Sequence, residues 1–541
     1  MKITKHFVTV GTRRVHYLRA GAGPAVALLH ASPCSSKVMR PLMPIFGERF
    51  TVFAFDTPGF GLSDKLPIAS PTIESFADAL AETLDALGVA QTALYGRHTG
   101  ASIAVEFAAR HPARTSMALA DGFAVFPRRY SDDELTRYLE RLTPTWDGGH
   151  LTHLWFRYRD QHVFWPWNNQ TAAARSDTDV PSLDFLHRGV LELLEAGDDY
   201  RIGYAAAFRH RELAVLADLK VPVCFGNRPG DSMLKTMPLY PASAWTQVMP
   251  REFEAAALAE RAILERHPAK VNPPPAPACA PLPGRSTTDF IDIDGAQVLV
   301  RAFGDLRGAA APLLLIHHAP GSSALYDAQL AELAKRQPVV AFDLPGHGES
   351  EPLAGNPQDV NTWTSVAMKV VDRLGIATLH LRGHNGGAAV AVELAHQLGA
   401  RSLGLTLDAP LFPEDADRAR LAKNCAPPVE PTWDGSHWLR AWHHLRDSEL
   451  WWPWFERTRQ NARAAPRIDP VRLNLRVREA MKHPSSYQPA WQANLGYAWR
   501  ERLASVKAPL ALIAELDDTF AHLLPAARAT LNIAPWNRGT S

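Results

Sequence analysis

The chain contains one stretch of sequence twice, at a constant offset of 287 residues. Short motifs recur at this offset in the same order, without an insertion, over about two hundred residues. A duplication of this length predicts two copies of one domain, each of roughly 260 residues, which is a usual size for an α/β domain. The matched motifs are His30 with His317, Phe55-Asp56 with Phe342-Asp343, Pro144-Thr145-Trp146-Asp147-Gly148 with Pro431-Thr432-Trp433-Asp434-Gly435, and Trp165-Pro166-Trp167 with Trp452-Pro453-Trp454.

The repeat also fixes where the domains are expected. We place the first domain at residues 1–270 and the second at residues 286–541. Residues 271–285 read VNPPPAPACAPLPGR, a proline- and alanine-rich stretch without an apolar period, which is typical of a semi-rigid linker. The second copy is expected to be shortened at its C-terminal end, because Ser541 comes before the closing helix predicted for the first copy.

Composition limits the partners and the compartment. Apolar residues make up 46% of the chain and the net charge is only +1, so each half can bury a core and no basic face suggests nucleic acid. Four cysteines show neither metal-ligand spacing nor a disulfide framework, which indicates a reducing compartment. The N-terminus alternates like a hairpin, and no eighteen consecutive residues are apolar. We expect a cytoplasmic protein that binds no membrane.

The order of apolar segments predicts an α/β fold in each half. After a hairpin come continuous apolar runs at 26–29 and 51–55, as in strands buried on both faces, and a helix-period segment at 72–87. A third strand at 92–95 leads through a glycine-flanked turn into a helix at 101–110. The second copy repeats this order at 313–316, 338–342, 359–374, 378–381 and 388–398. Alternating strands and helices predict parallel strands with right-handed crossovers, whose carboxyl ends carry sites.

Three motifs carry a family resemblance. His30-Ala31-Ser32-Pro33 follows the first buried strand, Asp56-Thr57-Pro58-Gly59-Phe60-Gly61-Leu62-Ser63 follows the next, and Gly96-Arg97-His98-Thr99-Gly100 forms a strand-to-helix turn. In this order they resemble the α/β-hydrolase fold superfamily, and the resemblance covers both halves. It implies two tandem α/β-hydrolase-type domains, each a mostly parallel sheet with flanking helices and a helical cap. The caps are expected at about residues 122–216 and 409–503.

The chain departs from this family at the nucleophile. The family places serine, cysteine or aspartate at the turn, whereas this chain has His98 in one copy and Asn385 in the other. Asp231 and Asp518 match the family's acid, with Asp121 as an alternative in the first copy. No histidine was found at the family's position after the last strand, so a serine mechanism with an acyl-enzyme is not implied.

The two copies are therefore expected to differ. An asparagine has neither a nucleophilic hydroxyl nor a useful pKa, so Asn385, Asp518 and His317 are predicted to form a degenerate second site. Imidazole titrates near neutrality, so His98 is a candidate catalytic acid or base, oriented by Asp231 or Asp121. The alternative is that His98 only fills a closed pocket.

Other residues are candidates for the pocket. The resemblance implies that His30 and Ala31 belong to the oxyanion loop and that Thr99 follows the elbow. From the cap, Trp155 and Trp165 could roof an apolar substrate, although packing within or between caps is the favoured explanation for the tryptophans. Cys34 lies in the oxyanion loop as a less favoured nucleophile without an assignable base.

We therefore predict an enzyme whose first half works by general acid/base chemistry around His98. Its substrate would be a small, largely apolar ester, lactone, amide or diketone, with no metal and no organic cofactor. One alternative is a catalytically inactive ligand-binding or scaffolding protein, and another is a cofactor-free lyase or isomerase, because the fold alone does not choose the chemistry. The expected partners are a small-molecule substrate, the neighbouring domain of the same chain and possible homodimers.

Overall fold

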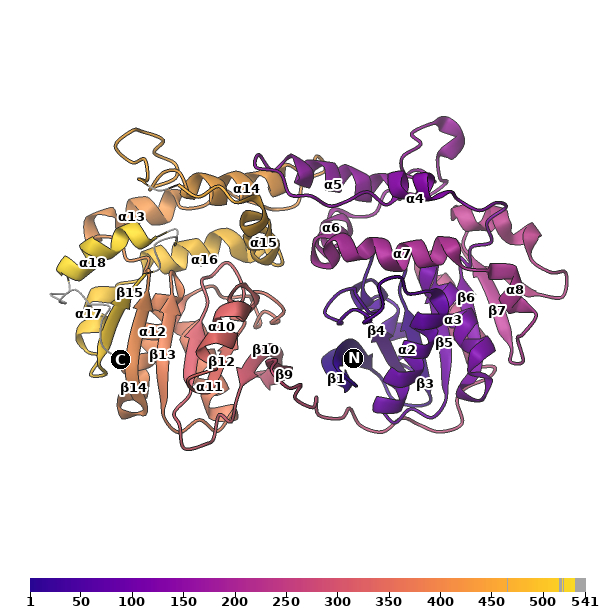
Figure 1. The fold of residues 1–541 in the computed structure, drawn as a ribbon, viewed down its shortest axis with the longest axis horizontal. Coiled ribbons are helices and arrows are strands. Elements are labelled where there is room, and N and C mark those ends of the chain that lie inside the picture. The colour runs from indigo at the N-terminus through magenta and orange to yellow at the C-terminus, as the bar shows by residue number, and fades with distance from the viewer. Residues whose placement is uncertain (465, 515–517, 519, 531–541) are drawn as a thin grey trace. The chain divides into compact units, whose positions relative to one another are not determined.

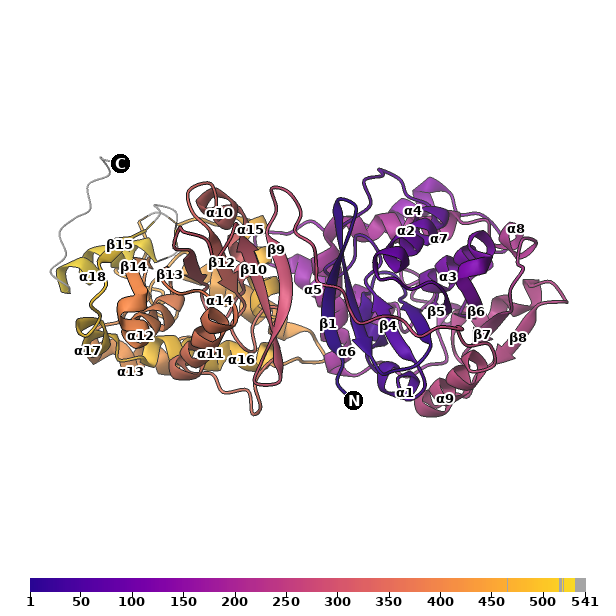
Figure 2. The ribbon, with the colours of Figure 1, turned by 90° about the horizontal axis from the view of Figure 1, so that it is seen from below.

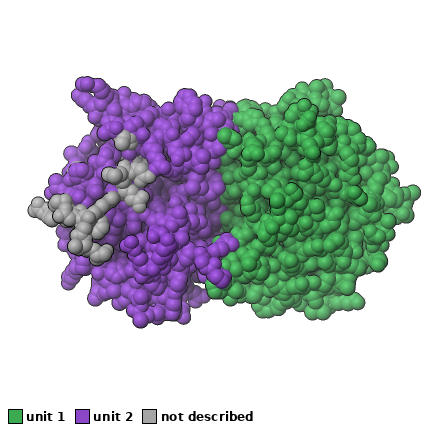
Figure 3. All heavy atoms as spheres, in the orientation of Figure 1, with its two compact units in different colours: residues 1–143, 153–282 green, residues 144–152, 283–541 purple. Residues whose placement is uncertain are grey.

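The structure of the protein is a computed structural model, and it describes residues 1–464, 466–514, 518 and 520–530. The chain divides into two compact units (Figure 3). Unit 1 comprises residues 1–143 and 153–282, and unit 2 comprises residues 144–152 and 283–541. Each unit is built on a mostly parallel sheet with helices on its faces, so the predicted fold class is confirmed.

Within the described residues, the sheet of unit 1 has eight strands in the order β1-β2-β4-β3-β5-β6-β7-β8 (Figure 1). β1 and β2 form the antiparallel N-terminal hairpin, β2 also pairs antiparallel with β4, and the other pairs are parallel. The central strands are apolar throughout because both of their faces are covered. The bounds are β1 (Thr4–Val10), β2 (Arg13–Ala20), β3 (Ala25–Leu29), β4 (Thr51–Phe55), β5 (Thr92–Arg97), β6 (Thr115–Asp121), β7 (Val223–Asn227) and β8 (Trp245–Val248).

Helices cover both faces of this sheet. α2 (Ile73–Ala86) and α3 (Thr99–Arg110) pack on one face, where their apolar residues join one core cluster. α1 (Met43–Phe46) and α9 (Phe253–Leu264) contact each other over a second cluster, and Figure 2 shows them side by side. α2 begins at Thr72, whose side chain accepts a hydrogen bond from the Ser75 backbone in a capping box.

Unit 2 repeats this architecture. Its described residues form a seven-stranded sheet in the order β15-β14-β13-β11-β12-β10-β9. α11 (Val360–Arg373) and α12 (Gly387–Leu398) pack over the larger apolar cluster, and α10 (Asp327–Leu333) packs over a smaller one. The strands are β9 (Thr287–Ile293), β10 (Ala296–Phe303), β11 (Leu313–Ile316), β12 (Val339–Phe342), β13 (Leu379–His384), β14 (Ser402–Asp408) and β15 (Leu510–Ile513).

A helical cap lies over the strand ends of each unit, as α7 and α16 illustrate in Figure 1. The helices of the first cap are α4 (Asp132–Tyr138), α5 (Gly149–Asp160), α6 (Leu183–Ala196), α7 (Tyr200–Arg209) and α8 (Glu212–Leu216). Those of the second are α13 (Asp415–Asn424), α14 (Ser436–Ser448), α15 (Pro470–Ala480), α16 (Pro484–Gly496) and α17 (Trp499–Ala504). In the part of the chain that is described, no helix has the length and apolar character to cross a membrane.

Candidate active site

The same backbone turn carries the candidate site in both units. His98 lies between β5 and α3 with φ 49° and ψ −111°. Asn385 lies between β13 and α12 with φ 47°. A residue other than glycine in such a conformation is strained by about 1–3 kcal/mol, so its surroundings must hold it there. The backbone N–H of His98 donates to the Asp121 carbonyl at 2.9 Å, and that of Asn385 donates to the Asp408 carbonyl at 2.9 Å. Both copies therefore share the sharp strand-to-helix turn, or elbow, that the resemblance implies.

Glycines on either side make this sharp turn possible. A Cβ on Gly100 would overlap the carbonyl oxygen of Leu29, and one on Gly96 would overlap that of Gly100. In unit 2 a Cβ on Gly387 would overlap the carbonyl oxygen of Ile316. The glycine pattern of the motif is therefore explained by backbone contacts between the elbow and the neighbouring strand.

Alanine at Gly387 is expected to destabilise unit 2, since its Cβ would have to displace backbone atoms. Overpacking of this kind costs about 1–3 kcal/mol, which thermal unfolding followed by circular dichroism would report as a lower Tm. Gly496→Ala is the matched control in the same unit, because a Cβ there meets no described heavy atom within 4 Å. Equal Tm values for the two variants would contradict this account of the elbow.

In unit 1 the elbow histidine pairs with the predicted acid. His98 Nε2 lies 3.0 Å from Asp231 Oδ2, and the His98 side chain is 35% exposed. Asp231 follows β7 and also accepts from the Met233 N–H at 2.9 Å. Burial raises the pKa of the Asp231 carboxyl, but the charges and hydrogen bonds of its surroundings, His98 and Arg97 among them, hold it well below its usual value overall. Since an ionised carboxylate only accepts, Nε2 carries the proton and Nδ1 is left as the acceptor.

The alternative acid, Asp121, faces different partners. Its Oδ2 accepts from the Tyr95 hydroxyl at 3.0 Å and from Arg228 Nε at 3.2 Å. Arg228 also donates to the buried Glu260 at 2.6 Å. In unit 2 the equivalent Asp408 pairs in the same way with an arginine, Arg382. The carboxylates of Asp121 and Asp408 thus belong to buried ion pairs beneath the elbow, and in unit 1 it is Asp231 that contacts His98.

The loop after the first central strand is held by its histidine. His30 Nδ1 donates to the Ala31 carbonyl at 3.0 Å, and Nε2 accepts from the Thr57 N–H at 2.9 Å. Register places this loop beside the elbow, because Leu29 pairs with Gly96. His317 makes the equivalent two contacts in unit 2, to the His318 carbonyl and the Leu344 N–H. Both ring nitrogens are used for backbone contacts, so each histidine orders its loop.

The two units differ at the N–H that follows the elbow. In the family this group helps to bind an oxyanion, and in unit 1 it belongs to Thr99, the first residue of α3. In unit 2 the corresponding Gly386 N–H donates to the ring nitrogen Nδ1 of His318 at 3.2 Å. His318 occupies the position of Ala31 in the repeat. In unit 2 this N–H is therefore already bonded to a side chain of the same unit.

The two candidate tryptophans of the first cap are Trp155, which is buried, and Trp165, which packs on aromatic residues of the cap. Trp155 is completely buried in α5. Trp165 stacks on Phe208 with ring centroids 6.3 Å apart and meets the edge of Tyr138 at 5.8 Å. These contacts favour the packing explanation for the tryptophan motifs.

His162 is the cap residue that sequence reasoning left without a role. Burial lowers its pKa to about 4, with smaller effects from the charges of Arg97 and His98. Its Nε2 is buried and has no hydrogen-bond partner among the described residues. The repeat contained one indication of a role for His162. Glu449 stands at the matching position, so only the first copy carries a histidine there.

Cys34 is unsuited to act as a nucleophile. It is buried, and its sulfur lies 3.6 Å from the Tyr158 hydroxyl. Burial raises the pKa of the thiol, with Glu192 adding to the effect, so the thiolate that would react is disfavoured.

In unit 2 the elbow asparagine is held by hydrogen bonds, and a different residue pairs with the acid. Asn385 Nδ2 donates to the Ala409 carbonyl at 3.1 Å and to Asp518 Oδ1 at 3.2 Å. His384 Nε2 lies 2.7 Å from Asp518 Oδ2. Sequence reasoning missed His384, because the family's histidine was sought after the last strand rather than next to the elbow. The structure thus gives each unit one histidine on its acid, from adjacent elbow positions.

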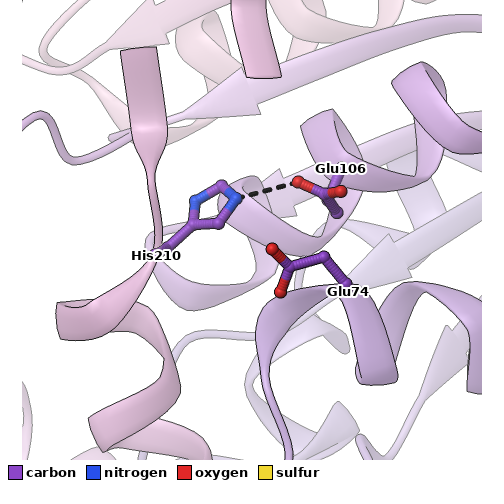
Figure 4. Close-up of side chains that lie close together, drawn as sticks. All are labelled: Glu74, Glu106 and His210. Carbon is purple, nitrogen blue, oxygen red and sulfur yellow. Dashed lines mark hydrogen bonds and ion pairs between the residues drawn. The ribbon is translucent and has the colours of Figure 1, made fainter. Parts of the chain in front are cut away.

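A separate cluster in unit 1 has the residue types of a metal site. Ligand-type atoms of Glu74, Glu106 and His210 lie within 4.8 Å of one another (Figure 4). His210 Nε2 and Glu106 Oε2 are 2.9 Å apart. In unit 2 the equivalent Glu393 accepts from the Tyr497 hydroxyl at 2.8 Å. Because a tyrosine makes the same contact there, we interpret the pair as a structural link between the helix after the elbow and the end of the cap.

Loss of this link is expected to destabilise both units to a similar extent. Glu106→Ala leaves His210 without its partner and Glu393→Ala leaves Tyr497 without its acceptor, which costs about 1–3 kcal/mol in each case. Glu393→Ala also removes the ion pair with Arg502 at 2.8 Å, which adds at most about 1 kcal/mol because the arginine is partly exposed. Chemical unfolding of the two variants and the unchanged chain would measure this. Zinc added to the unchanged chain should leave its Tm where it was. A zinc-dependent rise that Glu106→Ala abolishes would instead identify a metal site.

The fold and the elbow define the class of protein. The family described as alpha/beta hydrolase fold matches residues 24–193 and 311–431, which is more than half of the chain and falls in both repeats. The chain belongs to this family.

Individual relatives match only a part of the chain. It is 36% identical over 128 residues to the dihydrolipoyllysine-residue acetyltransferase component of the acetoin cleaving system of Cupriavidus necator, covering 24% of this chain and 33% of the relative. It is 35% identical over 107 residues to soluble epoxide hydrolase of Corynebacterium sp. (20% and 37%). It is 30% identical over 125 residues to 2-(acetamidomethylene)succinate hydrolase of Mesorhizobium japonicum (22% and 45%). The chain thus spans less than half the length of each of these relatives.

Two solved structures are similar to about half of the chain. Epoxide hydrolase A from Mycobacterium thermoresistibile is 16% identical with a TM-score of 0.39, and the match covers 50% of this chain and 100% of that one. E-2-(acetamidomethylene)succinate hydrolase is 20% identical with a TM-score of 0.35, covering 49% and 98%.

Proposed function

We propose that unit 1 is a hydrolase in which His98 acts as a general base toward water and Asp231 orients it. The observation that carries this proposal is the 3.0 Å contact between His98 Nε2 and Asp231 Oδ2, on a histidine that solvent reaches. This contact directs the basic nitrogen, Nδ1, away from the acid. A carboxylate that fixes the tautomer of an imidazole is a recurring arrangement for general-base catalysis.

The proposed reaction forms no covalent intermediate. His98 Nδ1 takes a proton from a water molecule as its oxygen attacks the substrate carbonyl. Asp231 stabilises the imidazolium that results. The negative charge on the carbonyl oxygen is received by backbone N–H groups of the oxyanion loop and of Thr99, as in the family. The tetrahedral intermediate then collapses, and the imidazolium returns its proton to the leaving group.

The cap residues near the elbow support a largely apolar substrate. The His162 ring contacts the rings of Tyr158 and Phe185, at centroid distances of 5.3 and 5.4 Å. Ligand pockets in proteins are mostly apolar with a few polar groups that fix orientation, and the buried Nε2 of His162 fits that role. A small ester, lactone, amide or diketone has the matching chemistry, with one polar carbonyl on an apolar body.

The test is a single-turnover assay in ¹⁸O-labelled water. The full chain is mixed with chromogenic esters, lactones and diketones, and product and protein are both analysed by mass spectrometry. Direct attack by water predicts one ¹⁸O atom in the acid product of the first turnover and no increase in the mass of the protein. A covalent adduct on the protein would contradict the general-base mechanism. Absence of turnover by the folded chain would favour the alternative of an inactive ligand-binding protein.

A further inference from the structure

A continuous chain of hydrogen bonds runs through the site of unit 2. The Tyr326 hydroxyl lies 2.7 Å from His384 Nδ1, and His384 Nε2 lies 2.7 Å from Asp518 Oδ2. Tyr326 comes from the turn before α10, His384 from the end of β13, and Asp518 from beyond β15. A hydroxyl, an imidazole and a carboxylate in this order are the parts of a proton relay.

The surrounding contacts fix the direction of each hydrogen bond. The His318 N–H donates to the Tyr326 oxygen at 3.4 Å, so the Tyr326 O–H is left to donate to His384. Burial raises the pKa of Tyr326, which keeps that proton on the phenol. Asp518 also accepts from the Phe520 N–H at 2.7 Å. Its pKa is lowered to about 2, because its interactions with His384 and its hydrogen bonds from Phe520 and Asn385 together outweigh the effect of burial.

This relay is specific to unit 2. At the matching positions of unit 1 stand Met39 and Arg97, neither of which can take part in it, although Asp231 is present. Met39 is buried in an apolar cluster. Unit 1 has the same fold without a tyrosine or a histidine at these two positions. The fold of unit 2 therefore does not require Tyr326 and His384 for its packing.

The relay lies at the wall of a cavity that could hold a small molecule. The cavity has a volume of about 550 Å³, and Tyr326, His384 and Asp518 line it. Arg472 and Arg476 line it from the cap. Both arginines donate at 2.6 Å to one buried carboxylate, Glu449, which also accepts from Arg463 at 2.9 Å. Carboxylates of Glu332, Asp408 and Asp518 line other parts of the cavity. The positive charge is therefore local to the cap side, where Arg472 and Arg476 can receive a carboxylate group of a ligand.

We propose that Tyr326, His384 and Asp518 form a second catalytic site, which moves a proton to and from a small carboxylate-bearing ligand held in this cavity. Tyr326 is the catalytic residue, and His384 and Asp518 are positioning residues that act through it. The site differs from that of unit 1, because the N–H after the elbow is already bonded to His318.

The step conserves atoms and charge. A C–H or O–H proton of the ligand passes to the Tyr326 oxygen as the Tyr326 proton passes to His384 Nδ1. The electron pair stays on the ligand, and the imidazolium formed on His384 is balanced by the Asp518 carboxylate. Return of the proton to a different atom of the ligand completes an isomerisation, and no oxidant or other reactant is required.

The test measures the reactivity of Tyr326 with a carboxylate-bearing probe. The full chain is treated with 4-(fluorosulfonyl)benzoate, which sulfonylates phenols that can transfer their proton and releases fluoride. Neutral 4-methylbenzenesulfonyl fluoride serves as the comparison. Peptide mapping should find Tyr326 modified about tenfold or more faster by the benzoate, because an Arg–carboxylate contact adds that selectivity. Malonate should slow the labelling by the benzoate.

The variant His384→Gln distinguishes a proton relay from a tyrosine that reacts only because it is accessible. Glutamine can still accept a hydrogen bond from Tyr326 but cannot take its proton, so labelling at neutral pH should fall about 100-fold. The labelling rate of this variant should then increase as the pH rises toward the ionisation of the phenol. The unchanged chain should already react at neutral pH. His98→Ala should label like the unchanged chain, which keeps this test independent of the proposed hydrolase. Failure of Tyr326 to react, or an equal rate in His384→Gln, would overturn the relay. Equal rates with the two probes would overturn the carboxylate ligand.

Discussion

Replacement of His98 by alanine is expected to lower kcat/KM for the hydrolysed substrate about 10²- to 10⁴-fold, which is the usual contribution of a general base. The variant removes the imidazole that contacts Asp231 at 3.0 Å and leaves the backbone turn in place. Alanine also opens a space of about the size of the lost ring. Added imidazole should therefore restore part of the rate, which a purely structural role of His98 would not allow.

The control is another histidine of the same unit. His267 is exposed beyond α9, so His267→Ala should hydrolyse the substrate like the unchanged chain. Steady-state kinetics on the three proteins, with circular dichroism to show that they are folded, would measure the effect. Full turnover by His98→Ala would show that the histidine is a remnant that fills the pocket.

Replacement of Asp231 by asparagine is expected to have an effect of similar size. In comparable arrangements, the loss of the carboxylate that fixes the histidine tautomer costs up to about 10⁴-fold in kcat. Asp121→Asn is the matched comparison at the other candidate acid. Because Asp121 bonds Tyr95 and Arg228, its variant should lose stability and retain the His98 contact. A larger loss of kcat in Asp121→Asn than in Asp231→Asn, with both folded, would reverse the assignment.

Asp231 also predicts a dependence of stability on pH. The folded protein holds the pKa of this carboxyl below its ordinary value of 3.8, so its ionised form stabilises the fold. That contribution is complete above pH 3.8 and is lost as the pH falls through the folded value. The free energy of unfolding should thus differ between the unchanged chain and Asp231→Asn by about 1–3 kcal/mol at pH 7. The difference should shrink at pH 3, and urea unfolding at the two pH values would show this. A constant difference would mean that the carboxylate is not stabilised by its surroundings.

The fold could be predicted from sequence because its signals are local. The offset of 287 residues, the apolar runs and the glycines of the elbow each depend on neighbours in the chain. His98 and Asn385 could be placed on the turn for the same reason. The predicted strand at 92–95 lacks only residues 96 and 97, which lead into the turn and belong to β5.

The site is formed by contacts between segments that are distant in the chain. The sequence does not show which of these segments meet. Asp121 and Asp231 both follow strands next to the elbow, and only side-chain direction separates them. The relay joins residues 326, 384 and 518, which no motif connects. Trp155 and Trp165 were candidates because tryptophan suits both pockets and cores, and their neighbours decide between the two. Tyr326, His384 and His162 differ from their counterparts in the other copy, but so do many other positions, so the repeat alone does not single them out.

The conformation of the elbow is the same in both units whichever residue occupies it. His98 and Asn385 adopt nearly the same φ, 49° and 47°, although their side chains share no chemistry. The turn is therefore shaped by the glycines and strands around it, and the residue at its tip is free to change without refolding the domain. A duplicated domain of this kind has two equivalent elbow positions on one chain. A new reactive residue can therefore arise at one position while the residue at the other keeps its function.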